Sequence, residues 1–285
     1  MATVYEIVTG KIIEQLERGV APWQKPWHLE APKNLCSGKA YRGINVLLLG
    51  MRGYASPWWL TFQQARERGG HVRKGEHGTL IVFWKWPQQA EATDATDDTR
   101  QAAAPLLRYY TTFNSEQCDG IAVPASVPTV NPIETAEAIA ASMPNPPTYE
   151  QSDKAAYAPA RDTVYMPARQ SFDTAEGFYS TRFHEMTHST GHTSRLNRQN
   201  VMQISYFGSE NYSREELVAE MGAAMLCAVS GIEAQTVHNS AAYIQNWLRV
   251  LKGDARMVVM AASQAQKAAD YIRGISKADA EEAAQ

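Results

Sequence analysis

Cysteine is scarce in this chain, and long runs of apolar residues are missing. Its three cysteines, Cys36, Cys118 and Cys227, are odd in number and widely spaced, which fits a reducing cytoplasm better than a disulfide framework. The longest apolar runs, such as 46–49 and 80–84, are far too short to cross a bilayer. The first residues also lack the apolar core of a signal peptide. We therefore expect a cytoplasmic protein with no membrane partner.

Aspartate is absent from the first 86 residues, and this shapes the distribution of charge. Residues 1–86 hold 12 Lys and Arg against 6 Glu, a net charge of +6, whereas residues 87–150 carry −7 and residues 151–285 carry −2. Six of the seven tryptophans lie in the basic segment. A chain that imitates DNA would need negative charge throughout, so that class is excluded. A basic, aromatic-rich module joined to a nearly neutral one predicts two domains.

The hydrophobic pattern predicts an α+β fold, and 44% hydrophobic residues are enough to bury a core. The first domain, 1–123, is expected to be a small mixed α/β unit in which the acidic, low-complexity segment 87–105 forms a mobile loop. Prolines mark a linker at 124–132, and 133–285 should be a helix-rich second domain. Helices are expected at 4–18, 44–51, 62–68, 133–142, 173–188, 213–229, 240–251 and 254–272, and strands at 78–86, 106–113, 155–157 and 163–166.

Two of these helices begin at capping-box spacings. Asp173 is followed three residues later by Glu176, and Ser213 is followed three residues later by Glu216. In this pattern the first side chain accepts from the backbone of the first turn. We therefore expect Asp173 and Ser213 to be the N-caps.

The most specific motif is His184-Glu185-Met186-Thr187-His188. On a helix the two histidines lie four residues apart on one face, so both imidazoles can bind one zinc ion. Glu185 lies beside them and can take a proton from a metal-bound water, which makes it the expected catalytic base. Zn²⁺ is the expected cofactor, with another divalent ion such as Mn²⁺ as the alternative.

The third metal ligand has more than one candidate. Gly191 fits the metzincin pattern, but Ser194 stands where that pattern requires a histidine and His192 is out of register. Glu216 and Glu220, four residues apart, resemble the acidic pair of gluzincins. That resemblance implies that Glu216 binds the metal while Glu220 orients a metal-bound histidine, although the two roles could be exchanged.

Two further features close to this motif predict local structure. Glu220 lies within an apolar run where an unused carboxylate would be costly, so Glu215 is expected to be the acid that faces solvent. The segment 162–167, just before the histidine helix, is compatible with an edge strand that binds a peptide by strand addition, or with an ordinary edge strand blunted by Pro167.

The basic module combines cations with aromatic rings, as proteins that bind single-stranded nucleic acid do. Lys and Arg follow the phosphates while exposed rings stack on bases. The alternative is that the tryptophans belong to the core and the charges are solvated. The candidate DNA-binding residues are Trp27, Lys39, Tyr41, Arg42, Trp58, Arg73 and Lys74.

Several segments together resemble ArdC-type antirestriction proteins. The likeness to the N-terminal domain of that family lies in Trp27, Asn34 and residues 37–39, 41–45, 59–62, 74–78 and 110–117. The likeness to its zincin-like domain lies in residues 183–192 and 215–220, with 242–244 and 247–248 matching its C-terminal helices.

The resemblance implies a plasmid-type protein that binds single-stranded DNA and protects incoming DNA from host restriction during conjugation. It also implies a metallopeptidase-like domain, with a restriction enzyme or an unknown protein substrate as partner. Two hypotheses follow. The chain is either a DNA-binding shield with a structural or vestigial metal site, or a DNA-tethered zinc metalloprotease that cleaves DNA-associated proteins.

Overall fold

The computed structural model describes residues 2–23, 31–85, 106–124, 131–198, 210–232, 241–276 and 278–280. Three of the expectations drawn from the sequence concern residues outside these ranges. The acidic segment 87–105, most of the linker and Trp27 lie outside the described residues. The domain boundaries at 123 and 133 stay predictions.

The N-terminal module is built around a four-stranded sheet of order β1-β2-β5-β4. Strands β3 and β6 form a separate two-stranded sheet. In the sheet, β1 runs parallel to β2, whereas β2 and β4 both run antiparallel to β5. The elements are α1 (Val4–Glu17), β1 (Lys33–Asn34), α2 (Ile44–Gly50), β2 (Trp58–Leu60), α3 (Phe62–Glu67), β3 (His71–Val72), β4 (Thr79–Lys85), β5 (Leu106–Asn114), the 3-10 turn η1 (Ser115–Gln117) and β6 (Cys118–Asp119).

Helix α1 illustrates how local sequence sets an element. The Thr3 hydroxyl accepts from the Glu6 amide at 3.2 Å, and the Glu6 carboxylate accepts from the Thr3 amide at 2.7 Å, which is a complete capping box. Val8, Ile12 and Leu16 repeat every four residues and are buried. The helix therefore buries one apolar face, as its spacing predicts.

The C-terminal module packs helices against a small three-stranded sheet of order β7-β9-β8. Its elements are α4 (Pro132–Ala141), β7 (Thr148–Gln151), β8 (Ala156–Ala158), β9 (Thr163–Met166), the 3-10 turn η2 (Arg169–Ser171), α5 (Ala175–Ser189), α7 (Glu210–Ser230), α8 (Ala241–Gly253) and α9 (Met257–Ile272). The predicted α+β class is confirmed.

The edge-strand interpretation of 162–167 was wrong, because β9 is the middle strand. Val164 pairs with Tyr149 of β7 on one side and with Tyr157 of β8 on the other. The strand of this sheet that the sequence did not predict is β7, whose four residues are all exposed and carry no alternating apolar signal; the short strands β1, β2, β3 and β6 of the N-terminal module were not predicted either. The backbone groups of β9 are thus already used within the sheet.

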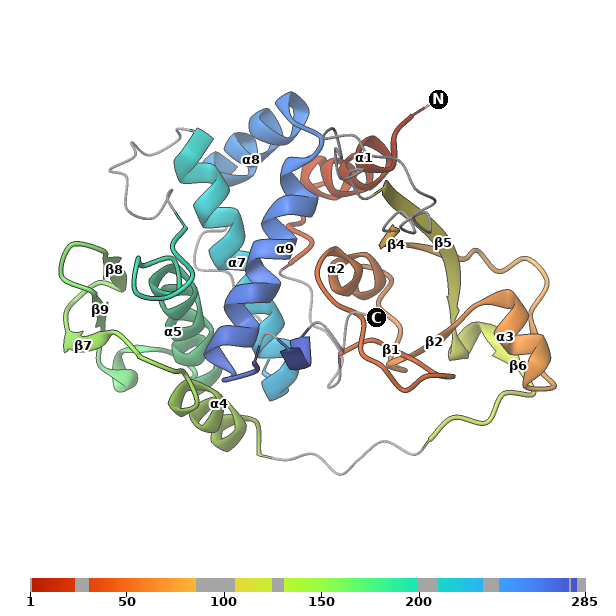
Figure 1. Ribbon diagram of the computed structural model, residues 1–285, viewed down its shortest axis with the longest axis horizontal. Coiled ribbons are helices and arrows are strands. Elements are labelled where there is room, and N and C mark those ends of the chain that lie inside the picture. Colours follow the sequence, from red (N-terminus) through yellow and green to blue (C-terminus); the bar gives the residue numbers. More distant parts are fainter. Residues whose placement is uncertain are drawn as a thin grey trace, which may run out of the picture.

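The two modules share one hydrophobic core. Helix α1 lies beside α8 and α9, and α2 lies beside α9 (Figure 1). A single buried cluster contains apolar residues from α1, α2, α5, α7, α8 and α9. At its centre Trp23 meets Trp247 edge-on, with ring centroids 5.0 Å apart. Around it, Thr9 donates to the Ala255 carbonyl at 2.6 Å, and Arg42 forms an ion pair with Asp270 of α9.

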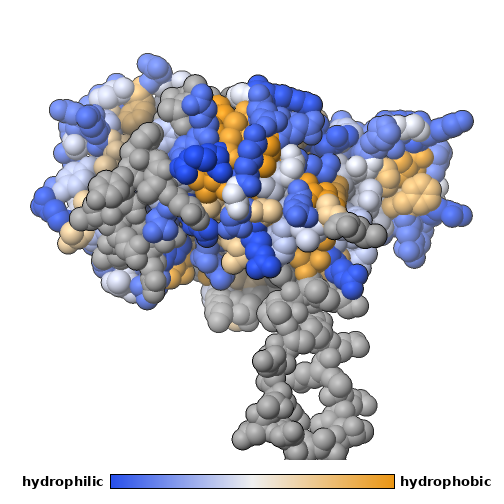
Figure 2. Space-filling model, turned by 90° about the horizontal axis from the view of Figure 1, so that it is seen from above, coloured by the Kyte–Doolittle hydropathy of each residue, from blue (hydrophilic) through white to orange (hydrophobic). Residues whose placement is uncertain are grey.

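The surface in Figure 2 is mostly hydrophilic, and its apolar groups fall in separate patches. Among the described residues, every helix is either too short or too polar to span a bilayer.

Candidate metal centre

Helix α5 carries the predicted histidine pair. Its N-cap is Thr174, whose side chain accepts from the Gly177 amide at 3.0 Å, so the assignment of Asp173 as N-cap was wrong by one residue. His184 and His188 lie on the same face, and their Nε2 atoms are 3.1 Å apart. The helix therefore presents both imidazoles to one point in space, as the four-residue spacing predicts.

Helix α7 brings acidic residues to this point. It begins at Glu210, so Ser213 lies inside the helix and is not its N-cap; the Ser213 hydroxyl instead accepts from the Asn246 amide of α8 at 2.5 Å. The two helices approach closely at Gly222, where a Cβ atom would lie 2.6 Å from Cγ2 of Thr187. A larger residue at 222 would push α7 away from the histidines.

Glu216 reaches both imidazoles. Its two carboxylate oxygens lie 3.6 Å from Nε2 of His184 and 3.6 Å from Nε2 of His188. One ligand atom from each of these three residues falls within 4.8 Å of the others. Two imidazole nitrogens and one carboxylate oxygen form a donor set that suits zinc or manganese.

Glu220 approaches His184 from its Nδ1 side, whereas Glu216 approaches it from its Nε2 side. Its carboxylate is buried and lies 3.7 Å from Nδ1 of His184. Burial alone would lower the pKa of the His184 imidazole, but its hydrogen bond with Glu216 and the neighbouring carboxylates raise that pKa to about 9. The carboxylates thus make the centre favourable for positive charge.

Glu215 is buried, so the expectation that it faces solvent was wrong. Arg198 donates to both of its oxygens, at 2.7 and 3.2 Å, and Nδ1 of His188 lies 3.3 Å from the same carboxylate. Burial opposes ionisation of Glu215, but Arg198 and His188 lower its pKa. From residue 215 to residue 228 every residue of α7 is buried, which the largely apolar sequence at 217–228 could have indicated.

Two tyrosines near the centre were missed by sequence reasoning. Tyr212 precedes Glu216 by one helical turn on α7, and its hydroxyl lies 3.0 Å from that of Tyr243 on α8. Burial first, and then the charge of Glu216 and hydrogen bonds to Tyr243 and Glu216, raise the pKa of Tyr212. The only local signal was the Tyr212–Glu216 spacing of four residues, because Tyr243 comes from a different helix.

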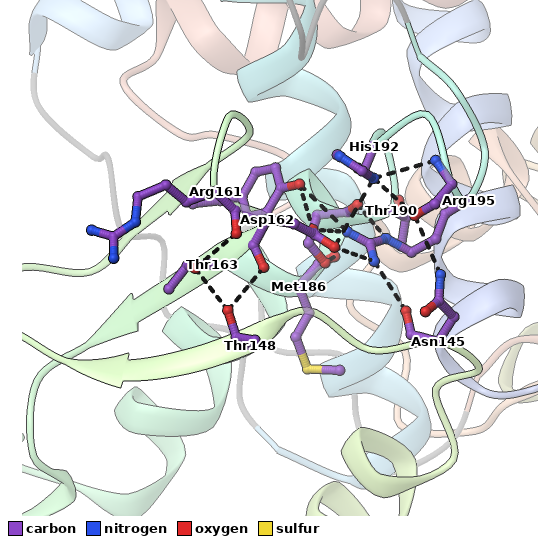
Figure 3. Close-up of polar contacts among 12 residues, drawn as sticks. Asn145, Thr148, Arg161, Asp162, Thr163, Met186, Thr190, His192 and Arg195 are labelled. Atoms are coloured by element: carbon purple, nitrogen blue, oxygen red, sulfur yellow. Dashed lines mark hydrogen bonds and ion pairs between the residues drawn. The ribbon is translucent and has the colours of Figure 1, made fainter.

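A polar network fixes the end of α5 against the sheet (Figure 3). The Arg195 guanidinium donates to the Ser189 carbonyl at 2.7 Å and to the Asn145 carbonyl at 3.0 Å. It also forms a two-pronged ion pair with Asp162. Asp162 lies in the turn between β8 and β9, where its φ is positive at 47°. Because Arg195 lies in the loop that follows α5, its ion pair with Asp162 joins that loop to the sheet.

Glu185 lies between the two histidines in the sequence, and its side chain is buried. Among the described residues, it is not one of the three whose ligand atoms converge. It nevertheless lies close enough for its charge to act on His184. This placement is compatible with a base beside a metal-bound water.

The predicted DNA-binding residues occupy different environments. Lys39 and Lys74 are exposed, whereas Trp58 is half-buried with the Lys33 ammonium 5.6 Å from its ring centroid. Tyr41 is half-buried and accepts from the Asn34 amide at 3.4 Å.

The two arginines of that set already have acidic partners. Arg42 pairs with Asp270 between the modules, and Arg73 pairs with Glu76 at 2.8 Å and with Asp119 at 3.5 Å. Two tryptophans of the basic segment, Trp23 and Trp59, belong to the core.

The fold and centre define an α+β protein with a zincin-like domain. Residues 134–264 match the family described as zincin-like metallopeptidase, and residues 2–113 match the N-terminal domain of anti-restriction factor ArdC. A zincin-like domain implies a divalent metal, and the two imidazoles with Glu216 are a suitable donor set for one.

The chain belongs to the family of ArdC antirestriction proteins. It is similar over its whole length to the crystal structure of ArdC from plasmid R388 in its Mn(II)-bound form, with 37% identity, a TM-score of 0.75, and 99% and 98% of the two chains covered. The metal-free structure of that protein gives a TM-score of 0.73 at the same identity.

Sequence relatives extend the comparison. The uncharacterized protein y4eC of Sinorhizobium fredii is 37% identical over 283 residues, covering 94% of this chain and 91% of that protein. Two Escherichia coli proteins named DNA primase TraC are 36% and 34% identical and are matched over 94% and 98% of this chain. The chain spans only 27% and 20% of their lengths.

Proposed function

We propose that this chain binds single-stranded DNA and thereby protects incoming DNA from host restriction. The observation that carries the proposal is the likeness to ArdC of plasmid R388 over nearly the whole of both chains. The +6 charge of residues 1–86 and the exposed side chains of Lys39 and Lys74 support a polyanionic partner. Three free thiols support a cytoplasmic location.

We assign His184, His188 and Glu216 as the ligands of a divalent metal, zinc or manganese. In this assignment Glu220 orients His184 and Glu215 orients His188, through the Nδ1 distances of 3.7 and 3.3 Å. A bound ion would supply Lewis acidity and an acidic water. In this assignment Glu185 would receive a proton from such a water.

A second candidate function keeps the same residues but gives Glu185 the main role. The chain would then be a DNA-tethered metalloprotease that cleaves a DNA-associated host protein or a restriction enzyme. The placement of Glu185 beside the histidines is what favours this candidate, because a structural metal site has no use for a base. The likeness to an antirestriction protein favours the shield.

The DNA-binding part of the proposal predicts a marked dependence of affinity on salt. We expect the full chain to bind a labelled oligothymidylate by fluorescence anisotropy, with an affinity that falls as salt rises because phosphate contacts release counterions. Lys39→Ala and Lys74→Ala should each lower the slope of log affinity against log salt by about 0.7.

Lys154→Ala, an exposed lysine of the C-terminal module, is the matched control and should leave the slope unchanged. If the affinity of the wild type did not change with salt, or if the chain bound a neutral polymer equally well, the proposed DNA binding would be refuted.

A further inference from the structure

One face of the β4–β5 pair is aromatic and cationic, and it is exposed at Arg108 and Tyr110, although Thr79 and Thr112 at its other end are buried. The register opposes Ile81 to Tyr110 and Phe83 to Arg108. Because side chains alternate along strands and paired residues share a face, these four side chains project from the same side of the sheet. This group is called the β4–β5 outer face below.

The opposite face of the same pair is used by the core. Leu80, Val82 and Leu107 pack into the shared hydrophobic cluster. Figure 1 shows α1 and α2 on one side of β4 and β5, and both helices contact this pair. The β4–β5 outer face therefore points away from these helices.

The rings of this face are arranged for stacking. Phe83 and Tyr110 lie parallel, with centroids 4.5 Å apart and an interplanar angle of 5°. Tyr110 is nonetheless 57% exposed, among the largest values for an apolar or aromatic side chain in the described residues. Phe83 thus stacks on one side of the Tyr110 ring while more than half of the residue stays exposed, and a ring held in one orientation loses less entropy when a base stacks on it.

A cation lies next to the rings. Arg108 precedes Tyr110 by two residues on the same face and is exposed. Among the described residues it forms no ion pair, in contrast to Arg42 and Arg73. A guanidinium that has no ion-pair partner in the described part of the chain and lies beside an exposed ring is suited to a nucleotide, whose base stacks while its phosphate accepts from the arginine.

We propose that the β4–β5 outer face is a base-stacking platform for single-stranded DNA, with Tyr110 as the stacking ring and Arg108 as the phosphate contact. The proposal rests on the proposed function, because it specifies where that DNA is held. A protein partner is less suitable, since an arginine next to an exposed, stacked ring matches the phosphate and the base of one nucleotide.

The test measures binding of the full chain to two oligonucleotides, one with normal bases and one abasic at internal positions. Tyr110→Ala should weaken binding to the normal strand about tenfold or more, as removal of a base-stacking ring does. Tyr110→Phe keeps the ring and should bind like the wild type. On the abasic strand, Tyr110→Ala and the wild type should bind equally, because no base is left to stack.

Two further variants locate the contact. Tyr109→Ala removes a ring that is 50% exposed but projects from the opposite face, and should change affinity less than twofold. Arg108→Gln should reduce the salt slope by about 0.7 on both strands.

Equal affinity of Tyr110→Ala and the wild type for the normal strand would overturn the platform. So would an equal loss on the abasic strand, or an equal loss in Tyr109→Ala. Failure of the wild type to bind either oligonucleotide would instead refute the proposed function itself.

Discussion

A His184→Ala variant should lose the metal, whereas Glu185→Gln should keep it. His184 and His188 have Nε2 atoms 3.1 Å apart and share Glu216, which lies 3.6 Å from each. Changes to residues that only orient ligands cost about 10- to 100-fold in metal affinity, so loss of a direct ligand should cost more than about 100-fold. Glu185 is proposed as a base and not a ligand, so its amide should change metal affinity only a few-fold.

The same experiment separates the two acids of α7. Glu216→Ala should behave like His184→Ala. Glu220→Ala should weaken binding only about 10- to 100-fold, because its carboxylate faces Nδ1 of His184 from 3.7 Å and leaves Nε2 available. Titration calorimetry with Mn²⁺ and Zn²⁺, together with metal content after dialysis, measures both.

Two outcomes would contradict this assignment. Equal metal content in His184→Ala and Glu185→Gln would show that the metal does not bind at the histidine pair of α5. Complete loss in Glu220→Ala with none in Glu216→Ala would exchange the roles of the two acids.

A Trp247→Ala variant should destabilise the whole chain and not one module alone. Trp247 is 1% exposed and contacts Trp23 of the other module edge-on. Truncating a buried tryptophan to alanine costs about 3–5 kcal/mol, a large share of the roughly 5–15 kcal/mol that stabilises a typical protein. Because the modules share a core, we expect one cooperative unfolding transition that moves to lower denaturant.

Urea unfolding followed by circular dichroism measures this effect. Met260→Ala, which truncates an exposed side chain on α9, is the control and should change the free energy of unfolding by less than about 0.5 kcal/mol. Two separate transitions, of which Trp247→Ala moved only one, would mean that the modules fold independently.

Local patterns predicted the helices and the histidine pair because their signals lie within a few residues. The four-residue spacing of His184 and His188 and the repeat of Val8, Ile12 and Leu16 both survive in the structure, since helical geometry alone determines which residues share a face. Strands β4 and β5 were found for a similar reason, as runs of β-branched and aromatic residues.

The errors concern contacts between segments distant in sequence. Glu215 looked solvated because its partner Arg198 arrives from the segment after α5. Strand β9 looked like an edge because β7 carries no apolar alternation. Arg42 looked available to DNA, yet it pairs with Asp270, which is 228 residues away in the chain. Such pairings depend on tertiary packing, which periodicity does not contain.

Conjugation of an unmodified plasmid into a restricting host tests the central claim most directly. Transfer frequency relative to a non-restricting host would be measured with wild-type protein, Glu185→Gln, and a Lys39→Ala, Lys74→Ala double variant, with DNA affinity determined for each. If protection comes from coating the incoming strand, Glu185→Gln should protect like the wild type, and the double variant should lose protection in step with its DNA affinity. Complete loss of protection in Glu185→Gln with DNA binding intact would contradict the shield and make proteolysis the mechanism.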